Sequence, residues 1–354
     1  MSEVIYERLA QHLDRLPAGF PRTESGVELR ILRKLFNPEE AELACHLQMM
    51  PETAEAIAAR VGQPEAELAE KLAALSRKGL ILRADRPEGA LYMAAQYVIG
   101  IWEYNVNNLD QELVRDMNEY SPVLFQAMSR MKTQQLRTIP IAASLDGTGA
   151  VLPYEEARRL IESQSKILVA PCICRKEHTL VGGGCGKLLE ACLVFSGGAH
   201  YYEKNGIGRV ITAEEALDIL KKAEVEGLVL QPTNAKKIIN ICLCCGDCCQ
   251  ILKNLRRHPK PAEVVHSNFY ARVRSADCIG CEVCLDRCQV EAIRMPDGTA
   301  EIDPDRCIGC GLCVPTCGGA AIDLLQKEEP DRYQPPDNIM ETFMRIGLER
   351  GLFG

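Results

Sequence analysis

The chain has 354 residues, of which 47% are hydrophobic, and a formal net charge of -8. This length predicts two or three domains with cores of their own, and the acidic balance argues against nucleic acid and anionic membranes as default partners. No stretch approaches the roughly 18 apolar residues of a membrane span, and the acidic N-terminus lacks the pattern of a signal peptide. We therefore expect a cytoplasmic protein, with a peripheral membrane partner left open.

Residues 1–95 predict helices followed by a hairpin. "NPEEAELACHLQMM" begins after an Asn cap, "PETAEAIAARVG" ends at Gly62, and the next helix has Leu68, Leu72 and Leu75 at helical spacing. "GLILRA" and "LYMAAQYVIG", separated by a turn at "RPEGA", predict two strands. This order resembles a winged helix-turn-helix domain, which implies DNA binding.

The charges of this segment argue against that function. Residues 37–85 contain nine acidic and five basic residues, and the N-terminal end of the would-be recognition helix carries Glu65, Glu67 and Glu70. These carboxylates would repel phosphate. We therefore predict docking, or homo- or hetero-oligomerisation through this winged-helix head, rather than DNA binding. Cys45 lies among apolar residues and is interpreted as a buried structural thiol.

Eighteen cysteines are the chief feature of the composition, and seventeen of them lie between residues 172 and 317. In a reducing cytosol such a number indicates metal binding, redox chemistry or both, rather than disulfides. Residues 96–150, which include the only tryptophan, Trp102, are interpreted as a helical linker subdomain without a catalytic signature.

Residues 151–265 predict a cysteine-rich iron–sulfur domain of α/β type. "VLPYEEARRLIESQS" predicts a helix, and "KILVAPCIC" and "KKIINICLCCGDCC" each predict an apolar strand that runs into cysteines. Between the two strands, "TAEEALDILKKAEVEG" predicts a helix with a capping box of Thr212 and Glu215. Two such junctions around a helix indicate that both cysteine groups lie at the same end of the unit.

Nine cysteines of this region are candidate metal ligands: Cys172, Cys174, Cys185, Cys192, Cys242, Cys244, Cys245, Cys248 and Cys249. The glycine-rich "VGGGCG" can fold Cys185 back toward the first pair, and a helix over "KLLEACLVF" would place Cys192 on the same side. Adjacent cysteines, such as Cys244 and Cys245, point in different directions on a regular backbone. Each such pair can therefore serve two clusters, or one cluster and a substrate.

Ligand counting limits the number of central clusters. Eight ligands would hold two further four-iron clusters with one thiol left over, whereas four ligands would hold one cluster and leave five thiols exposed to oxidation. We expect one or two central [4Fe-4S] clusters and favour two. Arg175, Lys176 and His178 follow the first pair and are either hydrogen-bond donors to a cluster or solvated loop residues.

Residues 266–330 contain a doubled motif. "CIGCEVCLDRC" and "CIGCGLCVPTC" both have the spacing C-x2-C-x2-C-x3-C, and "CQVEAIRM" and "CGGAAIDL" after them predict matching short helices. "MPDGTAEID" predicts a turn between short strands. The doubled motif resembles the bacterial two-cluster [4Fe-4S] (dicluster) ferredoxins, whereas zinc sites rarely interleave eight cysteines.

The resemblance implies two ligand sets, each with three cysteines from one motif and one from the other. The first set is Cys278, Cys281, Cys284 and Cys317, and the second is Cys307, Cys310, Cys313 and Cys288. The family usually has proline after the last cysteine of each motif, but this chain has Gln289 and Gly318 there. That departure removes no ligand.

Together these patterns predict an α+β multidomain protein that ends in a C-terminal tail, residues 331–354. "PCICRKE…CGK…C…NICLCCGDCC" resembles the cysteine-rich part of longer iron–sulfur proteins of anaerobes, a resemblance that implies no particular activity. We find no P-loop, dinucleotide fingerprint or Ser–His–Asp arrangement, so a flavin or nicotinamide would belong to another subunit.

Three functions remain open. The first is an electron-transfer subunit that passes single electrons through three or four [4Fe-4S] clusters to or from a partner oxidoreductase. The second is a reductase with a catalytic cluster or thiol site among the nine central cysteines. The third is a redox-sensing winged-helix regulator.

Overall fold

The computed structural model describes residues 2–145 and 151–353. The helices are α1 (Ser2–Asp14), α2 (Val27–Leu35), α3 (Pro38–Ala44), α4 (Ala54–Val61), α5 (Glu65–Arg77), α6 (Trp102–Tyr104), α7 (Gln111–Ser129), α8 (Ala157–Glu162), α9 (Ile173–Leu180), α10 (Ser196–Lys204), α11 (Ala213–Val225), α12 (Gln250–Arg257), α13 (Pro261–Val264), α14 (Val283–Arg287) and α15 (Ile339–Glu349). The strands are β1 (Glu52–Thr53), β2 (Ile81–Arg86), β3 (Gly89–Ala94), β4 (Ile167–Pro171), β5 (Glu190–Phe195), β6 (Arg209–Ile211), β7 (Val229–Pro232), β8 (Asn240–Cys244), β9 (Phe269–Val273), β10 (Ile293–Arg294), β11 (Glu301–Ile302) and β12 (Ile322–Gln326).

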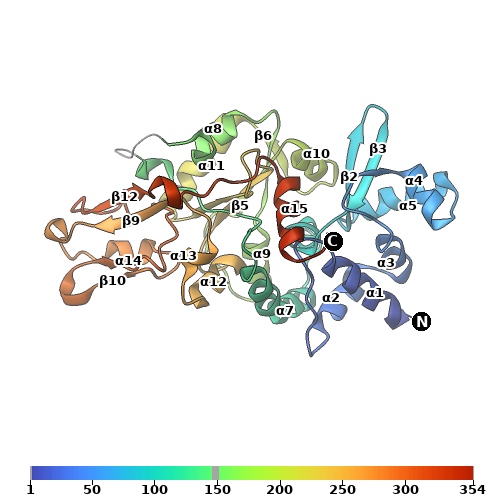
Figure 1. Ribbon diagram of the computed structural model, residues 1–354, viewed down its shortest axis with the longest axis horizontal. Coiled ribbons are helices and arrows are strands. Elements are labelled where there is room, and N and C mark those ends of the chain that lie inside the picture. The colour runs from blue at the N-terminus through green and yellow to red at the C-terminus, as the bar shows by residue number, and fades with distance from the viewer. Residues whose placement is uncertain (1, 146–150, 354) are drawn as a thin grey trace.

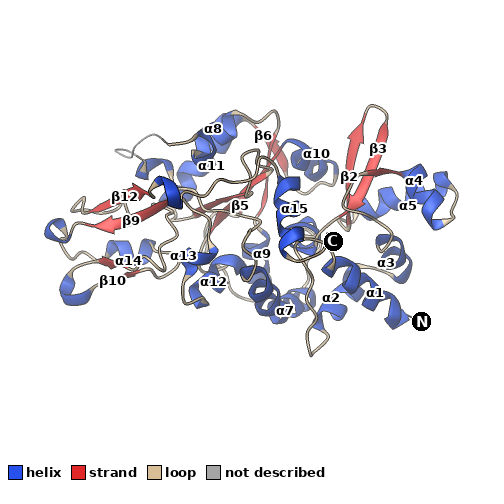
Figure 2. Cartoon of the chain, in the orientation of Figure 1, coloured by secondary structure: helices blue, strands red, loops and turns tan. Residues whose placement is uncertain are grey.

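Helices and sheets are mixed along the whole chain, and the strands gather in three places (Figure 2). The N-terminal helices and the β2–β3 hairpin lie at one end of the molecule, a five-stranded sheet lies in the middle, and the C-terminal module lies at the other end (Figure 1). Among the described residues, no helix is long and apolar enough to cross a membrane.

The helices and the hairpin predicted for residues 37–95 are present. The Asn37 side chain accepts a hydrogen bond from the Glu40 backbone while the Glu40 carboxylate accepts one from the Asn37 backbone, so a capping box begins α3. Helix α4 ends at Gly62, and β2 pairs antiparallel with β3. The short strand β1, which has no clear sequence signal, adds a third strand beside β3.

The N-terminal part shares one apolar core with the middle of the chain. Helix α2 packs against α7, and the Tyr201 hydroxyl of α10 donates to the carbonyl of Ile81 at 2.8 Å. At the C-terminus, Arg350 after α15 donates to the Leu16 carbonyl at 2.6 Å and pairs with Asp14 at 3.1 Å. The predicted tail therefore ties the N-terminal helices to the rest of the fold.

Residues 96–140 are less helical than predicted. Only α7 is a long helix, and after a turn residues 136–141 run beside β7, with Leu136 and Ile139 forming bridges to Thr233 and Leu230. The β-branched residues and Pro140 in this segment explain why it extends beside β7 instead of continuing the helix. Residues 146–150 of the predicted linker lie outside the described part of the chain.

The central sheet has the strand order β6-β4-β5-β8-β7, and all neighbouring strands are antiparallel. Strands β4 and β8 both pair with β5, so they run in the same direction and end at the same edge. Both faces of the sheet are covered: Leu168 and Ala170 contact the core shared with the N-terminal helices, whereas Ile167 and Val169 contact the core beneath α8 and α11.

The helix considered for residues 187–195 does not form, because residues 190–195 of this segment are strand β5 between β4 and β8. Ala191, Leu193 and Phe195 face one core, while Cys192 and Val194 face the other. Because both faces are apolar, the segment has no two-residue alternation, and a short apolar run of this kind does not distinguish a strand from a helix.

In the C-terminal module, β9 pairs antiparallel with β12, and β10 pairs with β11 across the predicted turn. The short helices predicted after each cysteine motif are wrong, since residues 288–292 and 317–321 are turns that lead into strands. The reason is local: the N–H groups of Ala292 and Ala321 donate to the sulfurs of Cys288 and Cys317, not to the backbone carbonyls that a helix would use.

Candidate metal centres

Two small cavities in the C-terminal module are each surrounded by four cysteines. Cys278, Cys281, Cys284 and Cys317 line the first, and Cys288, Cys307, Cys310 and Cys313 line the second. The structure thus brings together the two sets implied by the ferredoxin resemblance, with three cysteines from one motif and one from the other.

Backbone N–H groups point at the sulfurs in both sets. Ala300 and Ala321 donate to Cys278 and Cys317 in the first set, at 3.4 and 3.2 Å. In the second set the corresponding donors, Ala271 and Ala292, reach Cys307 and Cys288 at 3.4 and 3.1 Å. Such bonds favour the thiolate form and are the kind of contact that tunes an iron–sulfur cluster. The residues therefore fit one cubane cluster in each cavity.

Residues 259–331 match the family model described as a 4Fe-4S dicluster domain. The C-terminal module is an iron–sulfur domain. When bound, each [4Fe-4S] cluster supplies a one-electron redox couple. The match covers about a fifth of the chain, and no curated protein and no solved structure matches the sequence.

The two cysteine sets of the dicluster domain differ in exposure. In the first set Cys281 is exposed, and the neighbouring Ile279 is 67% exposed. In the second set, Cys288, Cys307 and Cys310 pack against the core of the central sheet. The domain therefore contacts the rest of the protein on its second side and leaves its first side open to solvent.

Gln289 joins the dicluster domain to the central cysteines. Its buried side chain accepts a hydrogen bond from the Gly246 N–H at 2.7 Å, and its carbonyl accepts one from Arg256 Nε at 3.0 Å. Gly246 lies in the loop "CCGDCC", and Arg256 lies in α12, which begins directly after that loop. The glutamine that replaces the usual proline thus braces the segment with four of the nine central cysteines.

All nine central cysteines lie at or near one edge of the sheet, where β4 and β8 end and β5 begins. The nine cysteines form two groups, one of three and one of six. Ligand counting favoured two sets of four with one cysteine left over, and the number of clusters stays untested. The sulfurs of Cys185, Cys245 and Cys248 lie within 4.8 Å of one another. The other six form a row in which each thiol interacts with the next, in the order Cys192, Cys242, Cys244, Cys249, Cys174, Cys172.

Adjacent cysteines fall in different groups. Cys244 belongs to the row and Cys245 to the group of three, and the same division separates Cys249 from Cys248. The extended backbone at the end of β8 turns successive side chains to opposite sides, and Cys249 lies at the start of α12. The structure is therefore compatible with the prediction that each adjacent pair serves two sites.

Neighbouring thiols of the row shift one another's pKa values in opposite directions. The pKa of Cys249 is held well below its usual range by the adjacent thiols of Cys174 and Cys244, and the pKa of Cys242 is lowered in the same way by Cys192 and Cys244. The pKa values of Cys174, Cys244 and Cys192 are raised by the same neighbours and by burial. Closely spaced thiols of this kind can be deprotonated together only if a metal centre compensates their charge.

The row lines a cavity that is larger than either cavity in the dicluster domain. Trp102, Phe125 and Tyr202 supply apolar walls, and Glu103 is a carboxylate at its edge. Burial raises the pKa of Glu103 to about 8, although the Gly100 N–H donates to it.

The residues after the first cysteine pair have different environments. Arg175 is buried beside the thiols, whereas Lys176 Nζ donates to Asn107 at 3.0 Å and His178 Nε2 lies 3.3 Å from Lys253 Nζ. Cys45 lies at the C-terminal end of α3 and contacts only the N-terminal core among the clusters of apolar residues described. Cys45 is only partly buried, and this burial raises the pKa of its thiol to about 11.

Sequence reasoning missed a buried carboxylate behind the row. Glu177 in α9 has no exposed surface, and it accepts hydrogen bonds from Trp102 Nε1 at 2.5 Å and from Gln250 Nε2 at 3.2 Å. Gln250 directly follows Cys249, and Glu177 lies three residues after Cys174. The signal is weak, because a glutamate in a helix is ordinarily a solvated residue.

We expect Trp102 to report the ionisation of Glu177. Burial raises the pKa of Glu177 to about 7 from an ordinary value of 4.5, against the effect of its two hydrogen-bond donors. Because the folded value is the higher one, this carboxyl's contribution to stability is complete below about pH 4.5 and is lost as the pH rises through about 7. With 5-fluorotryptophan at the single tryptophan, the 19F resonance should titrate near pH 7.

The matched variants are Glu177→Gln, which keeps an acceptor for Trp102, and Glu103→Gln, which removes the other buried carboxyl near the cavity. Titration near pH 7 should disappear only in Glu177→Gln. Its persistence in that variant would assign the ionisation to another group.

Proposed function

We propose that the protein is an iron–sulfur electron-transfer protein, which passes single electrons between a partner oxidoreductase and a third [4Fe-4S] cluster in the six-cysteine row. The observation that carries this proposal is the orientation of the dicluster domain. One of its cysteine sets faces solvent and the other is packed against the central cysteine segment. A module placed in this way connects the surface with the interior.

The exposed side has the features of a docking surface. Ile279 and Val283, which flank Cys281, are 67% and 42% exposed, so apolar side chains surround the first cysteine set. Exposed apolar residues at a functional site are typical of contacts with a protein partner. We assign the exchange of electrons with the partner to this side.

The N-terminal helices suit docking better than DNA binding. Glu65, Glu67 and Glu70, in the first two turns of α5, are all exposed. A helix that presents carboxylates at its N-terminal end is a poor reader of DNA, since phosphate oxygens would be repelled. This surface favours a role in assembly and gives no support to the regulator hypothesis.

Gln289→Ala tests the internal connection. The variant leaves the buried Gly246 N–H without an acceptor, which should cost about 1–3 kcal/mol of stability and loosen the loop that carries Cys245 and Cys248. After photoreduction of the dicluster domain, we expect slower electron arrival at the central centre, followed by freeze-quench electron paramagnetic resonance. Gln289→Glu keeps an acceptor oxygen and is the matched control.

An unchanged transfer rate in a destabilised Gln289→Ala protein would show that electrons take another route. A central region that never accepts an electron would remove the proposal altogether.

The apolar walls of the central cavity, which include Trp102, Phe125 and Tyr202, favour a second candidate, a reductase whose substrate occupies the space beside the row. That function requires a centre that responds to small ligands. The reductase function would be excluded if the cluster in the row is held by four thiolates and its spectrum does not change when thiols or other small ligands are added.

A further inference from the structure

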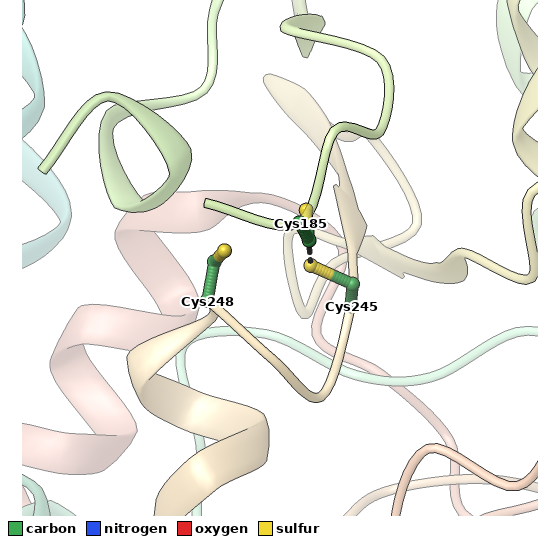
Figure 3. Close-up of side chains that lie close together, drawn as sticks. All are labelled: Cys185, Cys245 and Cys248. Carbon is green, nitrogen blue, oxygen red and sulfur yellow. Dashed lines mark hydrogen bonds between the residues drawn. The ribbon is translucent and has the colours of Figure 1, made fainter. Parts of the chain in front are cut away.

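Cys185, Cys245 and Cys248 converge from two separate segments (Figure 3). Cys185 lies on the glycine-rich loop before β5, and the other two lie on the loop between β8 and α12. Lys187 Nζ and Asp247 Oδ2, 3.2 Å apart, form an ion pair that joins the two loops. The three sulfurs are therefore held together by the fold around them.

The spacing of the sulfurs is that of ligands to one ion. The Sγ atoms of Cys185 and Cys245 lie 3.7 Å apart, and all three sulfurs are within 4.8 Å of one another. Tetrahedral zinc binds thiolate sulfur at about 2.3 Å, which places neighbouring sulfurs about 3.8 Å apart. The distance between the sulfurs of Cys185 and Cys245 is thus that of an edge of a zinc–thiolate tetrahedron.

The dicluster domain provides an internal comparison. Its eight cysteines surround two cavities in sets of four, yet no three of their sulfurs lie within 4.8 Å of one another. Wider spacing is expected there, because a cubane presents its iron atoms at separate corners. Within residues 2–145 and 151–353, Cys185, Cys245 and Cys248 are the one group of three cysteine, histidine or carboxylate ligands at this close spacing.

A buried cation lies beside the group. The guanidinium of Arg175 is 3% exposed, donates to the carbonyls of Leu188 and Leu243, and has no ion pair with a carboxylate in the described part of the chain. Its Nε lacks a hydrogen-bond partner. A buried charge of this kind needs a counter-charge, which an anionic metal–thiolate complex at this position would supply.

We propose that Cys185, Cys245 and Cys248 bind a single tetrahedral metal ion of the zinc type, separate from the iron–sulfur clusters. Three thiolates and a divalent ion have a net charge of -1, which the guanidinium of Arg175 balances. No fourth cysteine, histidine or carboxylate of the described residues joins the group at the same spacing. The glycines around Cys185 are exposed, so the fourth position faces solvent and takes water or an exogenous thiol.

Metal analysis of the full-length protein, purified without oxygen after growth with both iron and zinc, tests the proposal. We expect about one zinc per chain in addition to iron. Cys185→Ala should lose the zinc and keep its iron, and Cys45→Ala should keep both. Cys185→His should retain zinc because imidazole is also a zinc ligand. Zinc retained in this variant would show that the loss in Cys185→Ala comes from the missing ligand and not from misfolding.

Cobalt replacement gives a second readout. A Co²⁺ form should show the visible bands of a tetrahedral thiolate site, and an added thiol should shift these bands if the fourth position is open. Two results would overturn the proposal. One is a protein without zinc in which Cys185→Ala removes about four iron atoms, which would mean a cluster at this site. The other is zinc that persists in both Cys185→Ala and Cys245→Ala, which would mean an adventitious ion only.

Discussion

Protein purified without oxygen is expected to contain about twelve iron and twelve acid-labile sulfide ions per chain, four of each for three cubane clusters. Two clusters follow from the cysteine sets of the dicluster domain, and the third follows from the six-cysteine row. Cys249→Ala should reduce the iron content by about four per chain, because Cys249 lies in the middle of the row between Cys174 and Cys244.

The control for this experiment is Cys45→Ala, whose thiol contacts the N-terminal core and no other cysteine, and which should keep all of the iron. About eight iron atoms in the unaltered protein would mean that only the dicluster domain binds clusters. About sixteen would mean that the group of three cysteines also holds one, which agrees with ligand counting from the sequence and contradicts the single-ion site.

Local signals in the sequence predicted the elements that depend on local chemistry. The Asn37 cap, the stop at Gly62 and the turn between β10 and β11 all have side chains or backbone angles that favour one conformation. The two strand-to-cysteine junctions also predicted that β4 and β8 end on the same side, and both strands pair antiparallel with β5 and end at one edge of the sheet.

The segment around Cys192 could not be assigned in the same way. Its position as an inner strand depends on β4 and β8, which are distant in sequence, and its apolar residues serve both faces of the sheet. The turns after each cysteine motif were missed for a related reason. Their N–H groups bond to thiolate sulfur, a partner that helix patterns do not include.

The division of the nine central cysteines also depends on tertiary structure. The sequence shows that adjacent cysteines diverge, but it does not show which loop meets Cys185. That choice is made by the ion pair between Lys187 and Asp247 and by the direction of β8. The sequence shows only that Gln289 stands where the ferredoxin family usually has proline. The hydrogen bond that its side chain accepts from Gly246 is visible only in the structure.

Gly309→Ala is expected to disrupt the second cysteine set of the dicluster domain. Gly309 lies between Cys307 and Cys310 and has a φ of +67°, a conformation that costs an alanine about 1–2 kcal/mol. A β-carbon there would also overlap the carbonyl oxygen of Phe269 and lie 2.6 Å from Ser267 Oγ. The carbonyl cannot easily move away, because Phe269 is the first residue of β9 and pairs with Gln326.

Gly298→Ala isolates the steric part of this effect. Gly298 belongs to the same domain and has a similar φ of +76°, but no atom lies within 4 Å of the position that its β-carbon would take. We expect Gly298→Ala to lower stability by about 1 kcal/mol and to keep all of its iron, since only the backbone conformation is strained. Gly309→Ala should lower stability by about 2 kcal/mol or more beyond the loss in Gly298→Ala. It should also lose about four iron atoms per chain. Thermal unfolding and iron analysis of both variants measure the difference. Equal iron contents would show that the loop between Cys307 and Cys310 can shift away from β9, and that the close approach of the two segments is not required to bind the second cluster.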